Sequence, residues 1–123
     1  MSALLHRNIV PLASEMLGHF PALIIEGARQ VGKSTLAREV ASEGAKLLNL
    51  DDEQTRAAAI ADPAGFVRQA GDKQLILDEL QRLPELTLAV KSAIDENRRP
   101  GRFIITGSAS LLRVRGLSDS LAG

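Results

Sequence analysis

Residues 27–34 have the sequence Gly-Ala-Arg-Gln-Val-Gly-Lys-Ser, which fits the spacing of a phosphate-binding loop, G-x-x-x-x-G-K-[ST]. An apolar run over 22–25 precedes this stretch, and residues 35–40 continue as the first turns of a helix. Glycines at both fixed positions let backbone N–H groups turn inward toward an anion, and the helix start adds unpaired donors. The stretch therefore predicts a site for nucleotide phosphates, with a glycine turn that binds nothing as the alternative.

The end of this motif carries its chemistry. Lys33 supplies a mobile positive charge for the β- and γ-phosphates, and the Ser34 hydroxyl is suited to be one ligand of Mg²⁺. We expect nucleotide contacts from the whole loop and the first helical turn, that is from Gly27, Ala28, Arg29, Gln30, Val31, Gly32, Lys33, Ser34 and Thr35.

The composition predicts an aliphatic core and no strong bias toward one class of partner. Of 123 residues, 45% are hydrophobic and 2% aromatic, and 15 basic residues balance 15 acidic ones. Without net charge, no global field draws the domain onto nucleic acid. Cysteine is absent, and neither a signal-peptide pattern nor a bilayer-length apolar run is found. We expect one domain, or part of one, in the cytoplasm and away from membranes.

The first twenty residues are expected to form a helical arm. Their apolar residues recur at helical spacing, but Pro11 interrupts the pattern. Because proline is best tolerated in a first turn, we predict a short segment up to about Ile9 and a second helix from Pro11 to about His19. This arm, residues 1–20, would cover the sheet or pack beside it. His6 and His19 are far apart in sequence and are expected at surface or cap positions.

Short apolar runs alternate with helical segments along the rest of the chain, which predicts βαβ units, a parallel sheet and an α/β fold. The predicted strands are 22–26, 46–50, 74–79 and 102–106. The predicted helices run from Lys33 to a stop at Gly44, from a cap at Asp52, from Pro63 to Ala70, and from Pro84 to about Asn97.

Two pairs of acidic residues follow predicted strands. Asp51 and Asp52 have the spacing of a helix N-cap, with a direct catalytic role as the alternative. Asp78 and Glu79 follow three large aliphatic residues; because burying a bare carboxylate is costly, we expect them at the exposed carboxyl end of the strand, beside the glycine loop. Asp78 is predicted to hold Mg²⁺. Glu79, expected on the other side of the strand, is predicted to orient or deprotonate a water.

Hydroxyl groups end the fourth predicted strand. Thr106 and Ser108 would lie at its carboxyl end, where they could sense the γ-phosphate or fix the attacking water. Ordinary turn chemistry explains the same residues, since Ser and Gly are common in loops. The residues alone leave both interpretations open.

With these motifs in order, the chain resembles the nucleotide-binding half of a family of bacterial and archaeal AAA-like P-loop ATPases, whose members usually carry a C-terminal domain of unknown function, DUF4143. The likeness rests on the glycine loop, on Asn-Leu-Asp-Asp at 49–52, Leu-Asp-Glu-Leu-Gln-Arg-Leu-Pro-Glu-Leu at 77–86, Thr-Gly-Ser-Ala-Ser at 106–110 and Ser-Asp-Ser-Leu-Ala-Gly at 118–123.

The resemblance implies a three-layer α/β/α P-loop NTPase fold with a mostly parallel sheet, in which strand one lies between strands five and four. It implies ATP as the nucleotide and Mg²⁺ as its metal. It also implies the roles given above for the site residues, with Thr106 or Ser108 at the sensor position; the candidate catalytic residues are then Lys33, Glu79, Thr106 and Ser108.

Members of this family continue past the Ser-Leu-Ala-Gly stretch, so we expect residues 21–123 to be a partial P-loop ATPase core with about four strands. If the chain is complete as given, strand one becomes an open edge that is prone to pair with another chain, including a second copy. Arg113 and Arg115 follow the fourth strand, where an arginine acting in trans could arise.

The sequence thus predicts a domain that binds ATP with Mg²⁺ and, in the intact protein, hydrolyses it to drive a conformational change on an unknown partner. A small-molecule or nucleotide kinase is one alternative, and a module that holds nucleotide without catalysis is another. Nucleic acid is a further candidate partner, but a solvated or phosphate-facing surface is favoured because no stacking aromatics accompany the arginines concerned, Arg98, Arg99, Arg102, Arg113 and Arg115.

Overall fold

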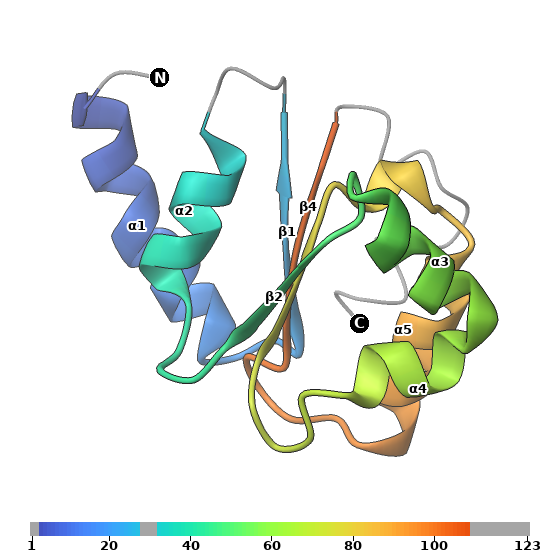
Figure 1. Cartoon of the computed structure of the whole chain (residues 1–123). Helices are drawn as coiled ribbons and strands as arrows, with labels where there is room; N and C mark the ends of the chain where they lie inside the picture. The colour runs from blue at the N-terminus through green and yellow to red at the C-terminus, as the bar shows by residue number, and fades with distance from the viewer. Residues whose placement is uncertain (1–2, 28–31, 109–123) are drawn as a thin grey trace.

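The computed structural model describes residues 3–27 and 32–108, which form a parallel sheet between two layers of helices (Figure 1). The strands are β1 (Ala22–Glu26), β2 (Lys46–Asn49), β3 (Leu75–Asp78) and β4 (Phe103–Gly107). They lie in the order β1-β4-β3-β2, and each neighbouring pair is parallel. The expected α/β fold is confirmed, and strand one lies beside strand four as the family resemblance implies.

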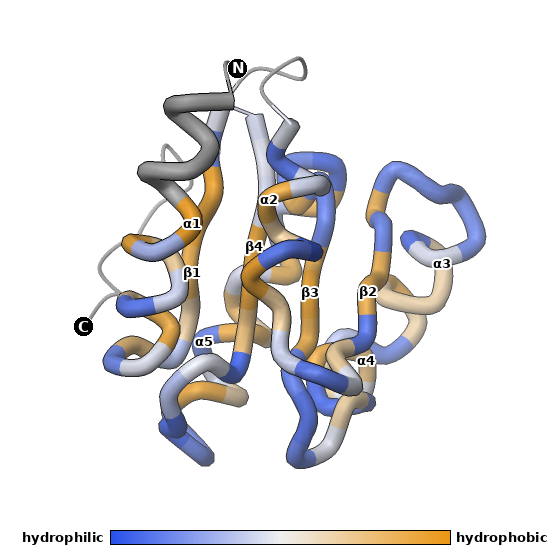
Figure 2. Tube along the Cα trace, turned by 90° about the vertical axis from the view of Figure 1, so that its left-hand side faces the viewer, coloured by the Kyte–Doolittle hydropathy of each residue, from blue (hydrophilic) through white to orange (hydrophobic). Residues whose placement is uncertain are grey.

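Helices cover both faces of this sheet. On one face lie α1 (Ala3–Leu17) and α2 (Lys33–Val40); on the other lie α3 (Glu53–Ala61), α4 (Pro63–Arg68) and α5 (Leu86–Glu96). A 3-10 turn, η2 (Leu80–Arg82), connects β3 to α5. Figure 2 shows hydrophobic residues concentrated along the strands, between these helices. None of the helices in the described part of the chain is long and apolar enough to cross a membrane.

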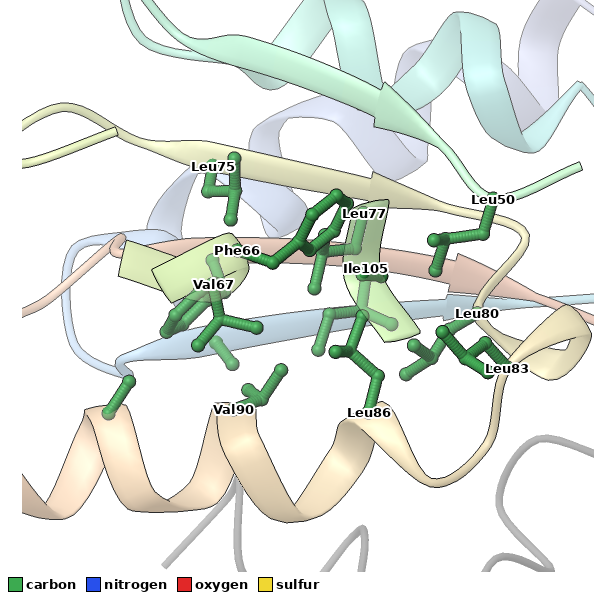
Figure 3. Close-up of a cluster of buried hydrophobic side chains, with 14 of the residues drawn as sticks. Leu50, Phe66, Val67, Leu75, Leu77, Leu80, Leu83, Leu86, Val90 and Ile105 are labelled. Carbon is green, nitrogen blue, oxygen red and sulfur yellow. The ribbon is translucent and has the colours of Figure 1, made fainter. Parts of the chain in front are cut away.

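Successive residues of the central strands contribute to two different cores, because side chains alternate across a strand. Leu75 and Leu77 of β3 pack with residues of α4 and α5, among them Phe66 and Val90 (Figure 3). Ile76, between them in sequence, packs instead in the cluster formed with α1 and α2. Strands buried on both faces explain the unbroken aliphatic runs of the sequence.

The N-terminal arm differs from the prediction. One helix, α1, runs from Ala3 to Leu17 with Pro11 inside it, where we expected a break. A proline inside a helix loses one main-chain hydrogen bond and costs ~3 kcal/mol or more. Ala13 and Leu17 are buried in the core with α2, and this packing holds the second half of the helix against the sheet. Local proline chemistry was therefore overridden by burial.

The end of α2 also differs from the prediction. The helix ends at Val40 and not at Gly44, because the N–H of Ser42 donates to Gln74 Oε1 at 2.8 Å. Gln74 is buried, and its Nε2 donates to the Gly101 carbonyl at 2.9 Å. Gln74 thereby ties the chain after α2 to the loop that precedes β4. Gly44 lies in the turn before β2 with φ +83°, a conformation that favours glycine.

Two of the arginines considered for nucleic acid have structural roles, and one of them, Arg102, does not lie on the solvated surface that we favoured. Arg102 is buried and donates to the carbonyls of Ala93 and Asn97, which closes the C-terminal end of α5. Burial lowers the pKa of Arg102 from its ordinary value. Arg99 donates to two backbone carbonyls of the turn before β3, at 2.9 and 3.0 Å. Arg113 and Arg115 lie outside the described residues.

The two-sided core gives a first prediction. Leu77 is fully buried, so Leu77→Ala is expected to lower the free energy of unfolding by about 2–5 kcal/mol through lost burial and the cavity left behind. Leu88 on α5 is 73% exposed, and Leu88→Ala should change stability by no more than about 0.5 kcal/mol. Denaturant unfolding of both variants checks this, and equal losses would contradict the assignment of Leu77 to the core.

Candidate nucleotide-binding site

The site begins where β1 ends and α2 starts. Gly32 precedes the helix with φ +72° and ψ +36°, in the left-handed region that favours glycine. It offers no capping side chain, and its carbonyl accepts the first helical bond from Leu36 at 3.0 Å. The unpaired N–H groups of the first turn are therefore available to an anion, as the motif predicts. Residues 28–31 of the predicted loop lie outside the described residues.

A cavity of about 320 Å³ opens beside this helix start, at the carboxyl edge of the sheet. Its lining combines the first turn of α2 with the ends of β2 and β3: Gly32, Lys33, Ser34, Thr35, Asn49, Asp51, Asp78 and Glu79. Six of these were expected at the site from the sequence. Asp51 was considered only through the alternative of a catalytic role, and Asn49 was given no role. Two strands, β4 and β3, separate β2 from the strand that precedes the loop, so only the folded sheet shows that β2 ends at the same cavity.

Asp78 is the most enclosed acid of this cavity. Its side chain lies at the carboxyl end of β3 as expected, but it is buried, with 4% of the residue exposed. The Ser34 hydroxyl donates to Asp78 Oδ2 at 2.8 Å, and the Thr106 hydroxyl donates to Asp78 Oδ1. Hydroxyl donors replace the water that the carboxylate loses, which is why burial at this position is tolerated. The expectation of an exposed carboxylate was therefore wrong for this residue.

We predicted that Glu79 would point to the other side of the strand from Asp78, but it does not. Its backbone is left-handed, with φ +62° and ψ +49°, so the alternation of β3 stops at Asp78. Its N–H donates to Thr106 Oγ1 at 3.0 Å, which helps to hold this uncommon conformation. The two acids consequently line the same cavity.

Lys33 lies against Glu79. Its side chain is almost fully buried, its Nζ donates to the Gly27 carbonyl at 3.0 Å, and Glu79 Oε1 lies 3.6 Å away. A buried ammonium needs such partners. The structure thus brings the lysine at the start of α2 and the acid that follows β3 within 3.6 Å of each other.

Residues at the carboxyl end of β4 also contribute to the site. Thr106 is fully buried and its hydroxyl contacts both acids, the side chain of Asp78 and the backbone of Glu79. Ser108 follows, and its N–H donates to Gln81 Oε1 at 3.1 Å. Gln81 in turn donates to Glu79 Oε1 at 3.3 Å. Gln81 belongs to the family-like stretch at 77–86, but no spacing rule assigned it a role, since it lies in the 3-10 turn η2.

Asp51 and Asp52 have different roles. Asp52 caps α3, because its Oδ2 accepts from the N–H and the hydroxyl of Thr55 at 2.9 and 2.8 Å, and these hydrogen bonds lower the pKa of Asp52. The N-cap prediction is confirmed. Asp51 lines the cavity, and its Oδ1 lies 3.2 Å from Nε of Arg82 at the rim.

The donor set suits a hard cation. Ser34 and Asp78 bring a hydroxyl and a carboxylate oxygen within 2.8 Å of each other at the wall of the cavity. Oxygen ligands of this kind fit Mg²⁺, which binds through one or two protein groups together with water and substrate phosphates. No group of three or more His, Cys, Asp or Glu side chains that could hold a metal occurs in the part of the chain that the structure describes. The residues fit a shared magnesium site better than an all-protein cage.

Sequence and fold comparisons agree with this geometry. A family model for an AAA domain matches residues 19–123, and the chain belongs to that family. Over 91% of its length the fold matches the P-loop NTPase domain of the sigma-54 transport activator from E. coli, covering 96% of that chain with a TM-score of 0.56 and 22% sequence identity. The fold is therefore that of a P-loop NTPase.

Two mycobacterial proteins are similar in sequence. Uncharacterized protein Rv2008c of Mycobacterium tuberculosis and Uncharacterized protein Mb2031c of Mycobacterium bovis are each 36% identical over 104 residues. The match takes in 84% of this chain and 23% of either relative. The chain thus spans about a quarter of the length of these relatives.

Two buried threonines give a matched prediction. Thr106→Val keeps the side-chain shape but removes the hydroxyl that serves both acids, and it is expected to lower the free energy of unfolding by about 1–3 kcal/mol. The buried hydroxyl of Thr87 in α5 has no hydrogen-bond partner among the described residues, so Thr87→Val should leave stability unchanged or raise it. Chemical denaturation of the two variants tests this, and a larger loss for Thr87→Val would refute it.

Proposed function

We propose that this chain binds ATP together with Mg²⁺, and that the intact protein hydrolyses the ATP to ADP and phosphate. One observation carries the proposal: the Ser34 hydroxyl and the Asp78 carboxylate, 44 residues apart in sequence, meet at 2.8 Å beside the Lys33–Glu79 pair. Hydroxyl, carboxylate, ammonium and a second acid around one cavity are the parts that phosphoryl transfer to water requires.

Phosphate binding is assigned to the loop at 27–34 and to the N–H groups that open α2. Lys33 would donate to the β- and γ-phosphate oxygens. Ser34 and Asp78 would hold Mg²⁺, which neutralises the charge that develops on the phosphates when bound. The buried position of Asp78 supports this assignment, because a cation offsets the cost of enclosing the carboxylate.

Glu79 is assigned to the attacking water. A triphosphate is a stronger anionic partner for Lys33 than one carboxylate, so nucleotide binding would draw the ammonium away from Glu79 Oε1. The released carboxylate can then accept a proton from a water while the water oxygen bonds to the γ-phosphorus and the bond to the β-γ bridging oxygen breaks. ADP leaves as the bridging oxygen departs with its electron pair.

Thr106 and Ser108 are proposed as the sensor elements of the site. Thr106 would hold the two acids in place through its hydroxyl, which contacts both of them. Ser108 lies one residue beyond β4, on the segment that reaches Gln81. Movement of this segment on loss of the γ-phosphate would give the protein a way to report hydrolysis.

The partner, the additional domain and the cellular location are also proposals. Coupling to a partner, association with a DUF4143 domain and location in the cytoplasm remain predictions from the sequence. Association with a second copy is one proposed route to an arginine supplied in trans. Without such an arginine, hydrolysis is expected to be slower by roughly 10³- to 10⁵-fold.

The loop lysine gives a direct test of binding. Lys33→Ala removes the cation that meets the phosphates and is expected to weaken ATP affinity by roughly 10- to 100-fold, the worth of one or two charge-assisted hydrogen bonds. Lys91→Ala on the exposed side of α5 should leave the affinity unchanged. Titration calorimetry with ATP and Mg²⁺ measures both, and equal affinities for the two variants would overturn the site.

The second acid gives a test of turnover. Glu79→Gln keeps the shape of the side chain but cannot take a proton, so hydrolysis is expected to fall by roughly 10²- to 10⁴-fold while ATP still binds. Glu43→Gln, on the exposed turn after α2, is the matched control. Undiminished phosphate release from Glu79→Gln would show the base assignment to be wrong, and phosphate found on an added acceptor would favour a kinase.

A further inference from the structure

Gln81 joins two parts of the site, the carboxylate of Glu79 and the backbone of Ser108. Its Nε2 donates to Glu79 Oε1 at 3.3 Å, and its Oε1 accepts from the Ser108 N–H at 3.1 Å. The residues it connects follow different strands, since Glu79 comes just after β3 and Ser108 just after β4. One amide therefore spans from the second acid of the cavity to the segment beyond the fourth strand.

The orientation of this amide is fixed by its partners. A carboxylate oxygen can only accept and a backbone N–H can only donate, so the amide nitrogen must face Glu79 and the amide oxygen must face Ser108. A flipped amide would lose both hydrogen bonds. Because η2 begins directly after the left-handed Glu79, the backbone turns back and brings Gln81 beside the carboxylate.

Within the described residues, Lys33 and Gln81 both approach Glu79 Oε1, and nucleotide binding would affect them differently. Lys33 Nζ lies 3.6 Å away and would bind the phosphates. Gln81 Nε2 lies 3.3 Å away and has no assigned phosphate contact. When Lys33 turns to the phosphates, the amide of Gln81 continues to fix the direction of the carboxylate. Glu79 then stays oriented at the moment when it has to meet the water.

We propose that Gln81 is the positioning residue for Glu79, and that it couples the orientation of this carboxylate to the segment at Ser108. The proposal rests on the hydrolytic function proposed above. It extends that function by adding a residue that touches neither phosphate nor metal. Its amide transmits a displacement of the Ser108 backbone to the carboxylate that handles the water.

A kinetic test separates this role from a merely structural one. Gln81→Glu keeps the size of the side chain and an acceptor for Ser108 but puts a like charge in place of the donor to Glu79, and Gln81→Met keeps the length without either hydrogen bond. In the full-length protein, both are expected to lower kcat by roughly 10- to 100-fold while KM for ATP stays within about twofold.

The matched control is Gln69→Glu, at the end of α4, where the amide donates to the Phe66 carbonyl away from the cavity. It should leave both constants unchanged. A kcat for Gln81→Glu equal to that of this control would overturn the proposal. So would a loss in which KM rises as steeply as kcat falls, since that would indicate damage to the whole site.

A second measurement does not depend on turnover. In protein with isotope-labelled glutamine and serine amides, Glu79→Ala should shift the NMR signals of the Gln81 side-chain amide and of the Ser108 backbone amide. The Gln81 amide loses its acceptor, and the Ser108 N–H donates to that same amide. Glu43→Ala should shift neither. If the Ser108 amide does not respond to Glu79→Ala, the coupling is refuted.

The two measurements also distinguish failure of the inference from failure of the proposed function. A protein that binds ATP without releasing phosphate would end the hydrolytic proposal, while the amide signals would still decide whether Gln81 links the two segments. An active protein in which Gln81 variants behave like the Gln69 control would keep the function and end the inference.

Discussion

The buried carboxylate of Asp78 is the constraint on which the rest of the site depends. Its two oxygens accept from hydroxyls of Ser34 and Thr106, which come from the first turn of α2 and from β4. Removing a charged group from water is costly unless partners replace the hydration, so these three side chains have to be brought together by the fold. The sheet order does this, since it places β4 between β1 and β3 and so sets the loop, the acid and the threonine at one edge.

The contacts at the same edge support the proposal that one site both binds nucleotide and responds to it. Lys33 lies against Glu79. The N–H of Glu79 donates to the Thr106 hydroxyl of β4, and the Gln81 amide connects the Glu79 carboxylate to the N–H of Ser108. In the proposed function, a phosphate that takes Lys33 from this arrangement would change the surroundings of the acid. The family match and the fold comparison identify the domain as an AAA domain with the fold of a P-loop NTPase.

The sequence was informative where a residue's role is set by its neighbours along the chain. The glycine loop, the aliphatic strands and the Asp52 cap follow from local spacing and local chemistry, and the structure contains the strands and the cap. It was misleading where distant contacts decide. The left-handed backbone of Glu79 is held by Thr106, the helix through Pro11 is held by burial, and Arg102 is drawn to the end of α5. Gln81 lay beyond prediction for the same reason, since both of its partners are defined only by the fold.

The central claim is that Ser34 and Asp78 form one magnesium-dependent nucleotide site. It is tested most directly by titrating ATP into the protein with Mg²⁺ and again with the metal chelated, in parallel with Asp78→Asn. The account predicts saturable binding that Mg²⁺ tightens in the parent and no longer tightens in the variant. ATP affinity that is absent in the folded parent, or that responds to Mg²⁺ equally in parent and variant, would contradict it.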